Sequence, residues 1–464
     1  MAAGVGVAAL LVVAATWSGA PVSAPGPPAP IVTDQWVNAT ATEGGLAGVH
    51  AARDFFAVVF TAAADSTVRL QAAGQFFNTT PIGWYRYGGG GTSYDPVTGT
   101  NFVPPPAGGK YVGETNALWN LTWFKSWCNA RPAGCQWLAF LPGEVNDTAF
   151  AVETAAWFHT VLGFAPTLWQ FGNEPAGWTH YGLNYSSWST ADASVPTAAA
   201  YASMAANYAA AVRTLYPTDA FVGLESGCGC DYRFASAVAS ALGTRAAGEA
   251  YHAFPSAPHD DTDPAAFLGT LNGSTNLVNE ASAFRGGLTA GCPGCGAVPV
   301  QLGAYQIGDA LHNPFVLAFP GAVFLGASVI QALLANVSMF TIFNSDSLFN
   351  TTSGTIEPQG VLVQRILANL TMGNDFPVVV NASGVGGIYA LATANGPHRS
   401  LFLVNANTTT GIRFAVPPTI VPNGTVGSIW TWNDTTTYPV ATTDGPIAPT
   451  YDVPAASILL LTWP

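Results

Sequence analysis

Two glutamates lie at the ends of short apolar runs, where a pair of catalytic carboxylates could be placed. Glu174 comes two residues after the run Leu168–Gly172, and Glu280 closes the run Leu277–Glu280, three predicted strands further along the chain. Two carboxyl groups at one cavity can divide the cleavage of a glycosidic bond: one protonates the leaving oxygen and the other attacks the anomeric carbon. A retaining mechanism needs them about 5–5.5 Å apart. We predict that Glu174 is the acid/base and Glu280 the nucleophile.

The segments around these glutamates alternate between strand and helix patterns. Short apolar runs with β-branched or aromatic residues alternate with Ala-rich stretches such as Ala149–Leu162 and Thr197–Tyr216, which is typical of βαβ units. Eight repeats predict an α/β fold, a (β/α)8 TIM barrel, whose catalytic side chains project from the C-terminal ends of the strands. The predicted strands are Phe55–Phe60, Ile82–Gly88, Gln136–Leu141, Leu168–Gly172, Phe221–Glu225, Ala250–Phe254, Leu277–Glu280 and Ser338–Phe343.

The pattern changes near residue 375. Residues 375–464 hold short alternating strands divided by Gly, Pro and Asn-Gly turns, which predicts a C-terminal β-sandwich. We expect the catalytic barrel to occupy residues 50–374. Residues 25–49 contain a Pro-rich linker and a strand over Ile31–Thr40, which we expect to join the sandwich.

Four motifs carry a resemblance to a known family. Gly-Asn-Glu-Pro at 172–175 resembles the acid/base signature of barrel glycosidases whose catalytic pair lies on strands 4 and 7. The stretch Asn-Glu-Ala-Ser-Ala-Phe-Arg-Gly-Gly at 279–287 is similar to the nucleophile segment of the heparanase and β-glucuronidase family, glycoside hydrolase family 79. Tyr-Arg-Tyr-Gly-Gly at 85–89 and Tyr-His-Ala-Phe at 251–254 resemble the strand-2 and strand-6 segments of that family. The resemblance runs over residues 30–464.

The resemblance implies roles for further residues. Asn173 would hydrogen-bond the sugar 2-hydroxyl, and Arg86 and His252 would belong to the substrate site. His252 either orients the nucleophile or is a structural histidine. The resemblance also implies that the backbone N–H groups of Gly286 and Gly287 hold a uronic carboxylate.

Three positions depart from the family's pattern. Arg285 stands where the family more often has an aromatic, and it either pairs with the uronic carboxylate or is exposed. Phe254 lacks the hydroxyl that the family has near its nucleophile, and the family's acidic residue after strand 1 has no match at 60–62. These departures weaken the prediction of a preference for glucuronides more than they weaken the prediction of hydrolysis.

The charge of the chain limits the classes of molecule that it is expected to bind. The net charge is −13, from 26 acidic against 13 basic residues, and Lys110 and Lys125 are the two lysines. Nucleic acids and heavily sulfated chains require clustered cations, which this sequence lacks. We expect a β-linked carbohydrate substrate, uronic-acid-containing or related, and no nucleic acid, metal or other cofactor. The alternatives are a barrel glycosidase acting on neutral sugars, such as a β-xylosidase or β-glucanase, and a non-catalytic glycan-binding protein of the cell envelope.

The first residues are typical of an export signal. An apolar run over residues 2–17 is followed by Val22-Ser23-Ala24, which resembles a cleavage site, so we assign residues 1–24 to a signal peptide. An uncleaved anchor is the alternative, and no membrane span is expected beyond this segment. Thirteen Asn-x-Ser/Thr sequons agree with a secreted, glycosylated protein.

Six cysteines lie in three close pairs. An even number in an exported chain favours disulfides, and we predict a local bridge between Cys128 and Cys135. The rival interpretation is a zinc site with four thiolates, because two further pairs have a spacing that suits tetrahedral coordination. Those four cysteines are Cys228, Cys230, Cys292 and Cys295.

Overall fold

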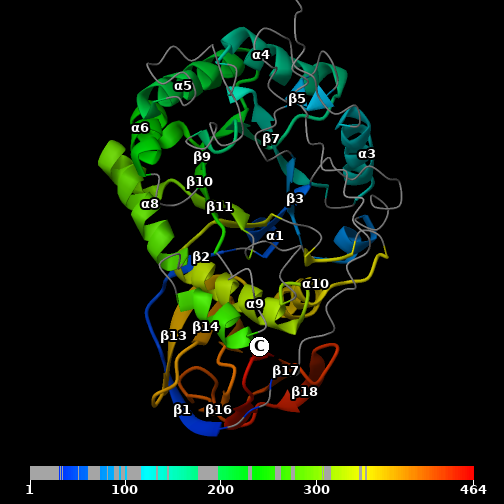
Figure 1. Ribbon diagram of the computed structural model, residues 1–464, viewed down its shortest axis with the longest axis vertical. Helices are drawn as coiled ribbons and strands as arrows, with labels where there is room; N and C mark the ends of the chain where they lie inside the picture. Colours follow the sequence, from blue (N-terminus) through cyan, green and yellow to red (C-terminus); the bar gives the residue numbers. More distant parts are fainter. Residues whose placement is uncertain are drawn as a thin grey trace, which may run out of the picture.

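The computed structural model contains a closed barrel and an antiparallel sheet region (Figure 1). It describes residues 31, 33, 35–50, 52–60, 74–80, 82–87, 94–95, 100–101, 117–131, 134–143, 146–175, 197–227, 232–255, 263–272, 277–305, 307, 315–343, 347–350 and 353–464. Eight parallel strands close the barrel in the order β10-β11-β12-β3-β4-β7-β8-β9. In chain order they are β3 (Phe56–Phe60), β4 (Trp84–Tyr87), β7 (Gln136–Leu141), β8 (Leu168–Phe171), β9 (Ala220–Ser226), β10 (Gly248–Ala253), β11 (Val300–Tyr305) and β12 (Met339–Ile342). The predicted fold class is confirmed.

The barrel strands are apolar on both faces because both faces are buried. Small and medium side chains point inward and form a separate inner cluster, which includes Ala57, Leu138 and Val222. Bulky side chains such as Trp137 and Tyr251 point outward and belong to the large cluster that also holds the helices. Residues that alternate along a strand therefore serve two cores, which explains the nearly continuous apolar runs in the sequence.

Helices follow the outside of the barrel. In Figure 1 α4, α5, α6 and α8 border one side of the strands, α3 lies on the opposite side, and α9 lies between the barrel and the sheet region. The Ala-rich α5 is capped by Thr197, whose hydroxyl accepts a hydrogen bond from the Ala200 N–H. The helices are α1 (Ala52–Phe55), α3 (Ala117–Ala130), α4 (Thr148–Ala156), α5 (Ala198–Leu215), α6 (Tyr232–Leu242), α7 (Pro264–Gly269), α8 (Leu277–Gly291), α9 (Phe319–Leu334) and α10 (Pro358–Val361).

The prediction of a seventh barrel strand at Leu277–Glu280 is wrong. These residues form the first turn of α8, and the seventh strand is β11. The apolar run is too short to distinguish strand from helix by itself. The longer pattern decides, since the buried side chains of Leu277, Ala281, Phe284 and Leu288 recur every three or four residues and so lie on one helical face.

The sheet region has ten strands, one of which comes from the N-terminal part of the chain. β1 (Gln35–Glu43) lies between β13 and β16, antiparallel to the first and parallel to the second. β13 bridges the two halves of the region, because one end pairs with β14 and the other with β1. The other strands are β2 (Gly48–Val49), β13 (Asn374–Ala382), β14 (Ile388–Asn395), β15 (His398–Asn405), β16 (Thr410–Ala415), β17 (Val426–Asn433), β18 (Val440–Pro446), β19 (Thr450–Val453) and β20 (Ser457–Trp463). A short hairpin pairs β5 (Tyr94–Asp95) with β6 (Thr100–Asn101).

Packing against α9 joins the sheet region to the barrel. On β15 Leu401 and Leu403 face the interior of the sandwich, whereas Phe402 and Val404 belong to the barrel cluster. A buried polar contact lies at the same junction: the His50 ring contacts the Asp375 carboxylate and, at 2.7 Å, the Val337 carbonyl oxygen. No helix in the described part of the chain combines the length and the apolar character needed to cross a membrane.

The disulfide prediction is confirmed. Cys128 and Cys135 are bonded at the end of α3. Cys292 and Cys295 form a second bridge, which removes two of the four thiolates that a zinc site would need. The other pair, Cys228 and Cys230, lies outside the described residues, as does the predicted signal peptide.

Candidate active site

Polar side chains from four strands meet at the C-terminal end of the barrel. Arg86 lies on β4, Glu174 follows β8, Glu225 lies near the end of β9, and His252 lies on β10. Hydrogen bonds and ion pairs link all four. This is the end of the barrel at which parallel strands present catalytic side chains.

Two residues in the left-handed region shape the turn after β8. Gly172 has φ 74° and Glu174 has φ 51°, a conformation that is uncommon for a residue with a side chain. The turn is fixed on both sides, because the Gly172 N–H donates to the Leu141 carbonyl at 3.0 Å and the Glu174 N–H donates to the Glu225 carbonyl at 2.8 Å. The strained backbone therefore places the Glu174 side chain over the neighbouring strand β9.

Arg86 is buried beneath the site. Its guanidinium donates to Asn173 Oδ1 at 2.6 Å and to the Gly303 carbonyl at 3.1 Å, and it lies 3.2 Å from a Glu225 oxygen. The side chain has no exposed area, so its predicted contact with substrate is not supported. Arg86 instead holds the carboxylate and the amide that surround it. Asn173 is 3% exposed, and its contact with a sugar hydroxyl stays a prediction.

His252 lies between two carboxylates. Its Nδ1 contacts Glu174 Oε1 and its Nε2 contacts Glu225 Oε1. Burial by itself would lower the pKa of His252, but the charge of Glu225 and the hydrogen bonds to both carboxylates outweigh burial and the charge of Arg86, so the pKa is raised. A doubly protonated ring can donate to both neighbours at once. Glu174 is therefore in contact with a group that holds a proton.

Glu174 is the member of this cluster that reaches solvent. Its side chain is 13% exposed, whereas those of Arg86 and Glu225 are fully buried and that of His252 is 2% exposed. A carboxyl at a strand end, open to the barrel mouth on one side and hydrogen-bonded to a buried histidine on the other, can exchange a proton with a bound molecule.

The structure does not bring Glu280 to Glu174. The Tyr251 hydroxyl reaches the Leu277 carbonyl of α8, and the charge of Glu280 contributes to the raised pKa of Tyr251 after burial. Tyr251 and His252 are consecutive in β10 and point to opposite faces of the sheet. Glu280 therefore approaches the barrel wall from outside, whereas Glu174 contacts His252 on the inside. The prediction that Glu280 is the nucleophile required both carboxylates to face one cavity, and the structure does not place them so.

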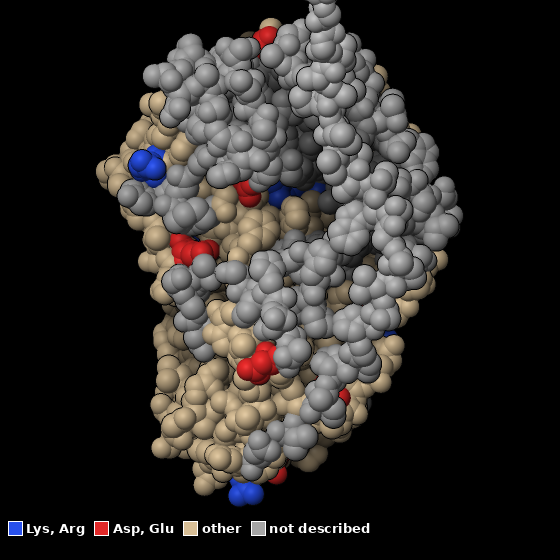
Figure 2. All heavy atoms as spheres, viewed as in Figure 1, with Lys and Arg blue, Asp and Glu red and all other residues tan. Residues whose placement is uncertain are grey.

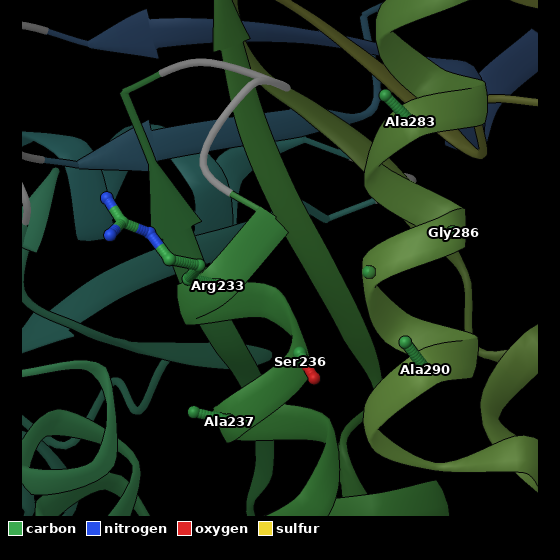
Figure 3. Close-up of a pocket in the computed structure, with 7 residues that line it drawn as sticks. Arg233, Ser236, Ala237, Ala283, Gly286 and Ala290 are labelled. Carbon is green, nitrogen blue, oxygen red and sulfur yellow. The ribbon is translucent and has the colours of Figure 1, made fainter.

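The other predicted residues of the 279–287 segment also lie on α8. Gly286 and Gly287 are inside the helix rather than in a turn, so their backbone N–H groups belong to the helical ladder. Arg285 contacts the carbonyls of Ala335 and Asn336 just after α9. The predicted uronate site is not formed by these residues. Figure 3 shows that α8 faces α6 across a groove lined by Arg233, Ser236, Ala237, Ala283, Gly286, Gly287 and Ala290.

The actual seventh strand supplies no acid in its described part. β11 reads Val-Gln-Leu-Gly-Ala-Tyr, and its Tyr305 hydroxyl contacts Ser328 Oγ on α9. The first carboxylate that follows β11 in the sequence is Asp309, which lies outside the described residues. Within the described segments, no cluster of His, Cys, Asp and Glu side chains is suited to hold a metal ion.

Glu225 ends a predicted strand, and from the sequence it is either a substrate contact or a structural carboxylate; in the structure it is a buried partner of Arg86 and His252. Sequence reasoning missed two other members of the cluster. Gln170, a polar residue within an apolar strand, contacts Glu225 and Arg86. Gly303 lies on the strand that the sequence analysis did not identify.

No family model matches the chain, and no curated protein is similar to it in sequence. Solved structures of glycoside hydrolases match its fold. A family 51 α-L-arabinofuranosidase from Bifidobacterium longum aligns with a TM-score of 0.66 and 14% identity, over 92% of this chain and 100% of that one. A family 44 xyloglucanase from Paenibacillus polymyxa aligns with 0.61 and 10%, over 92% and 99%. A family 30 endoxylanase from Clostridium papyrosolvens aligns with 0.57 and 12%, over 92% and 99%. At these identities the similarity shows the fold, a (β/α)8 barrel with a C-terminal β-sandwich.

Proposed function

We propose that this protein hydrolyses glycosidic bonds, with Glu174 as the acid/base. One observation carries the proposal: Glu174 is a partly exposed carboxyl at the end of the fourth barrel strand, held by a strained turn and hydrogen-bonded to His252. The fold similarity to arabinofuranosidases, xyloglucanases and endoxylanases supports a carbohydrate substrate. Protonation of the leaving oxygen by Glu174 is the step that this arrangement serves.

For the stereochemical course we propose retention, which the Gly-Asn-Glu-Pro motif favours. Retention needs a second carboxylate about 5–5.5 Å from Glu174. Glu225 is enclosed by Arg86, Gln170 and His252, so it cannot reach a sugar carbon. We therefore place the nucleophile in the segment that follows β11, where Asp309 is the first acid in the sequence.

For the substrate we propose a neutral β-linked glycan rather than a uronide. The arginine of the cluster is buried and paired with Glu225, and the glycines expected to bind a uronic carboxylate lie in α8. Among the described residues on the face shown in Figure 2, charged side chains are few, and 39 of the 464 residues in the chain are Lys, Arg, Asp or Glu.

We also propose that the protein is exported and N-glycosylated. The apolar N-terminal run, the sequons and the disulfides support this, and sequon residues Asn38, Asn369 and Asn423 are exposed. Digestion of natively expressed protein with a peptide-N-glycosidase should reduce its mass by several glycans. An unchanged mass would reject glycosylation.

The test of hydrolysis is a panel of aryl glycosides followed by covalent trapping. We expect turnover of β-xylosides or β-glucosides, loss of turnover in Glu174→Gln, and retention of configuration in the first product. A fluorinated inactivator of the same sugar should label the segment after β11. A label on Glu280 would restore the original pair, and an inverted product would reject the retaining course.

The second candidate is a glycan-binding barrel without hydrolysis. The observation that favours it is the absence of a carboxylate from the described residues of β11. Binding of oligosaccharides in calorimetry, without turnover of any panel substrate by folded protein, would establish this candidate and reject the first.

A further inference from the structure

Glu225 and Gly303 fit each other across the barrel interior. A Cβ atom on residue 303 would lie 2.7 Å from Glu225 Cδ, closer than real Cβ atoms come to other atoms, and nearer still to Glu225 Oε1. Glycine is therefore required at this position of β11. The seventh strand leaves a space at this level, and a carboxylate from the fifth strand fills it.

The Glu225 carboxylate, which fills this space, contacts buried polar side chains. Glu225 has no exposed side-chain area and meets Arg86 at 3.2 Å, the Gln170 amide and the His252 ring. An arginine and two further donors therefore surround this carboxylate. Glu225 lies behind His252, on the side away from Glu174, and its charge contributes to the raised pKa of His252.

This inference rests on the proposed function and assigns a role to the residue that the function leaves unexplained. We propose that Glu225 is a positioning residue that keeps a proton on His252 Nε2 and thereby makes His252 and Glu174 share the proton used at the glycosidic oxygen. Gly303 provides the room for it. Neither residue touches the substrate.

The proton balance follows from the contacts. Glu225 accepts the Nε2–H of His252, so the second ring proton lies between Nδ1 and Glu174 Oε1. Glu174 gives this shared proton to the leaving oxygen while the nucleophile forms a bond to the anomeric carbon and the glycosidic bond breaks, which leaves Glu174 as a carboxylate beside a neutral His252 ring. A water molecule then returns a proton to the Glu174–His252 pair as its hydroxyl displaces the nucleophile from the sugar.

Among the described residues, the charged groups that face His252 are Glu174 from the β8 turn, Glu225 from β9 and Arg86 from β4. The Phe254 ring packs edge-on against the imidazole, with centroids 5.7 Å apart. Replacing Glu225 by Gln keeps the shape but removes the charge that opposes Arg86. The imidazolium then loses its main stabilising neighbour, and His252 becomes neutral at a lower pH.

The first measurement is the ¹⁵N NMR titration of the His252 ring, assigned by comparison with His252→Gln. In the wild-type protein both ring nitrogens should be protonated at pH 7. In Glu225→Gln the titration midpoint should fall by about one pH unit or more. A neutral His252 ring in the wild-type protein at pH 7, or an unchanged midpoint in folded Glu225→Gln, would overturn the proposal.

The matched control is Glu249→Gln. Glu249 is equally buried, but it lies on the opposite face of β10, against Gly223, so its removal should leave the His252 titration unchanged. A midpoint that moves as much in this control as in Glu225→Gln would indicate a general structural effect and reject the specific role.

The pH profile of kcat/KM links the proton to catalysis. The His252–Glu174 pair titrates as a unit, so the alkaline limb should move to lower pH in Glu225→Gln by an amount similar to the NMR midpoint. If the midpoint moves and the limb does not, the proton is not used in catalysis and the proposal fails. If the wild-type protein hydrolyses nothing while the NMR midpoint behaves as expected, the proposed function fails instead.

Discussion

Replacing Glu280 by Gln tests whether this residue is the catalytic nucleophile or a buried carboxyl outside the active site. Burial raises the pKa of Glu280 from 4.5 to about 7, and its Oε2 atom is buried without a hydrogen-bond partner among the described residues. Because the folded state binds this proton more tightly than the unfolded state, the wild-type protein loses stability as the pH rises from about 4.5 to 7. The full difference corresponds to about 3 kcal/mol, which solvent screening of this half-buried carboxyl reduces to about 1–2 kcal/mol.

Glutamine imitates the protonated acid at every pH. Urea unfolding at pH 8 should therefore give Glu280→Gln a free energy of unfolding about 1–2 kcal/mol above that of the wild-type protein, with little difference at pH 4. Glycosidase activity should be retained. The control is Glu153→Gln on the exposed face of α4, which should change stability by less than about 0.5 kcal/mol at both pH values. A folded Glu280→Gln variant with activity reduced a thousandfold would refute the placement of Glu280 outside the site.

Three further predictions concern the site and the fold. Glu174→Gln should lower kcat by about 10²–10⁴-fold in the aryl glycoside assay without unfolding the protein, and unchanged turnover would reject its role. Replacing both Cys128 and Cys135 by Ser should lower the free energy of unfolding by about 2–3 kcal/mol, since the bridge closes a short loop, and reducing agent should then have no further effect at this bridge. His50→Leu should cost about 3 kcal/mol in thermal unfolding, because the Asp375 carboxylate loses its partner in a buried junction; a cost below about 1 kcal/mol would contradict this.

The sequence alone predicted much of the framework. Seven of the eight barrel strands coincide with short apolar runs, and the C-terminal strands coincide with short runs that are separated by turn residues. The Gly-Asn-Glu-Pro motif located the acid/base candidate, because the turn and the strand end are both encoded within a few residues. The Cys128–Cys135 bridge was equally local. Such local features can be predicted from the sequence because the periodicities of strands and helices extend over two to four residues.

Tertiary structure decided which carboxylates share the site. Whether Leu277–Glu280 is a strand or a helical turn depends on its packing against Tyr251 and its neighbours, and a one-residue change along a strand moves a side chain to the other face of the barrel wall. The close contact between Glu225 and Gly303 involves two strands that are not adjacent in the barrel, so no spacing in the sequence predicts it. Such a contact is defined by closure of the barrel, and closure depends on the whole chain.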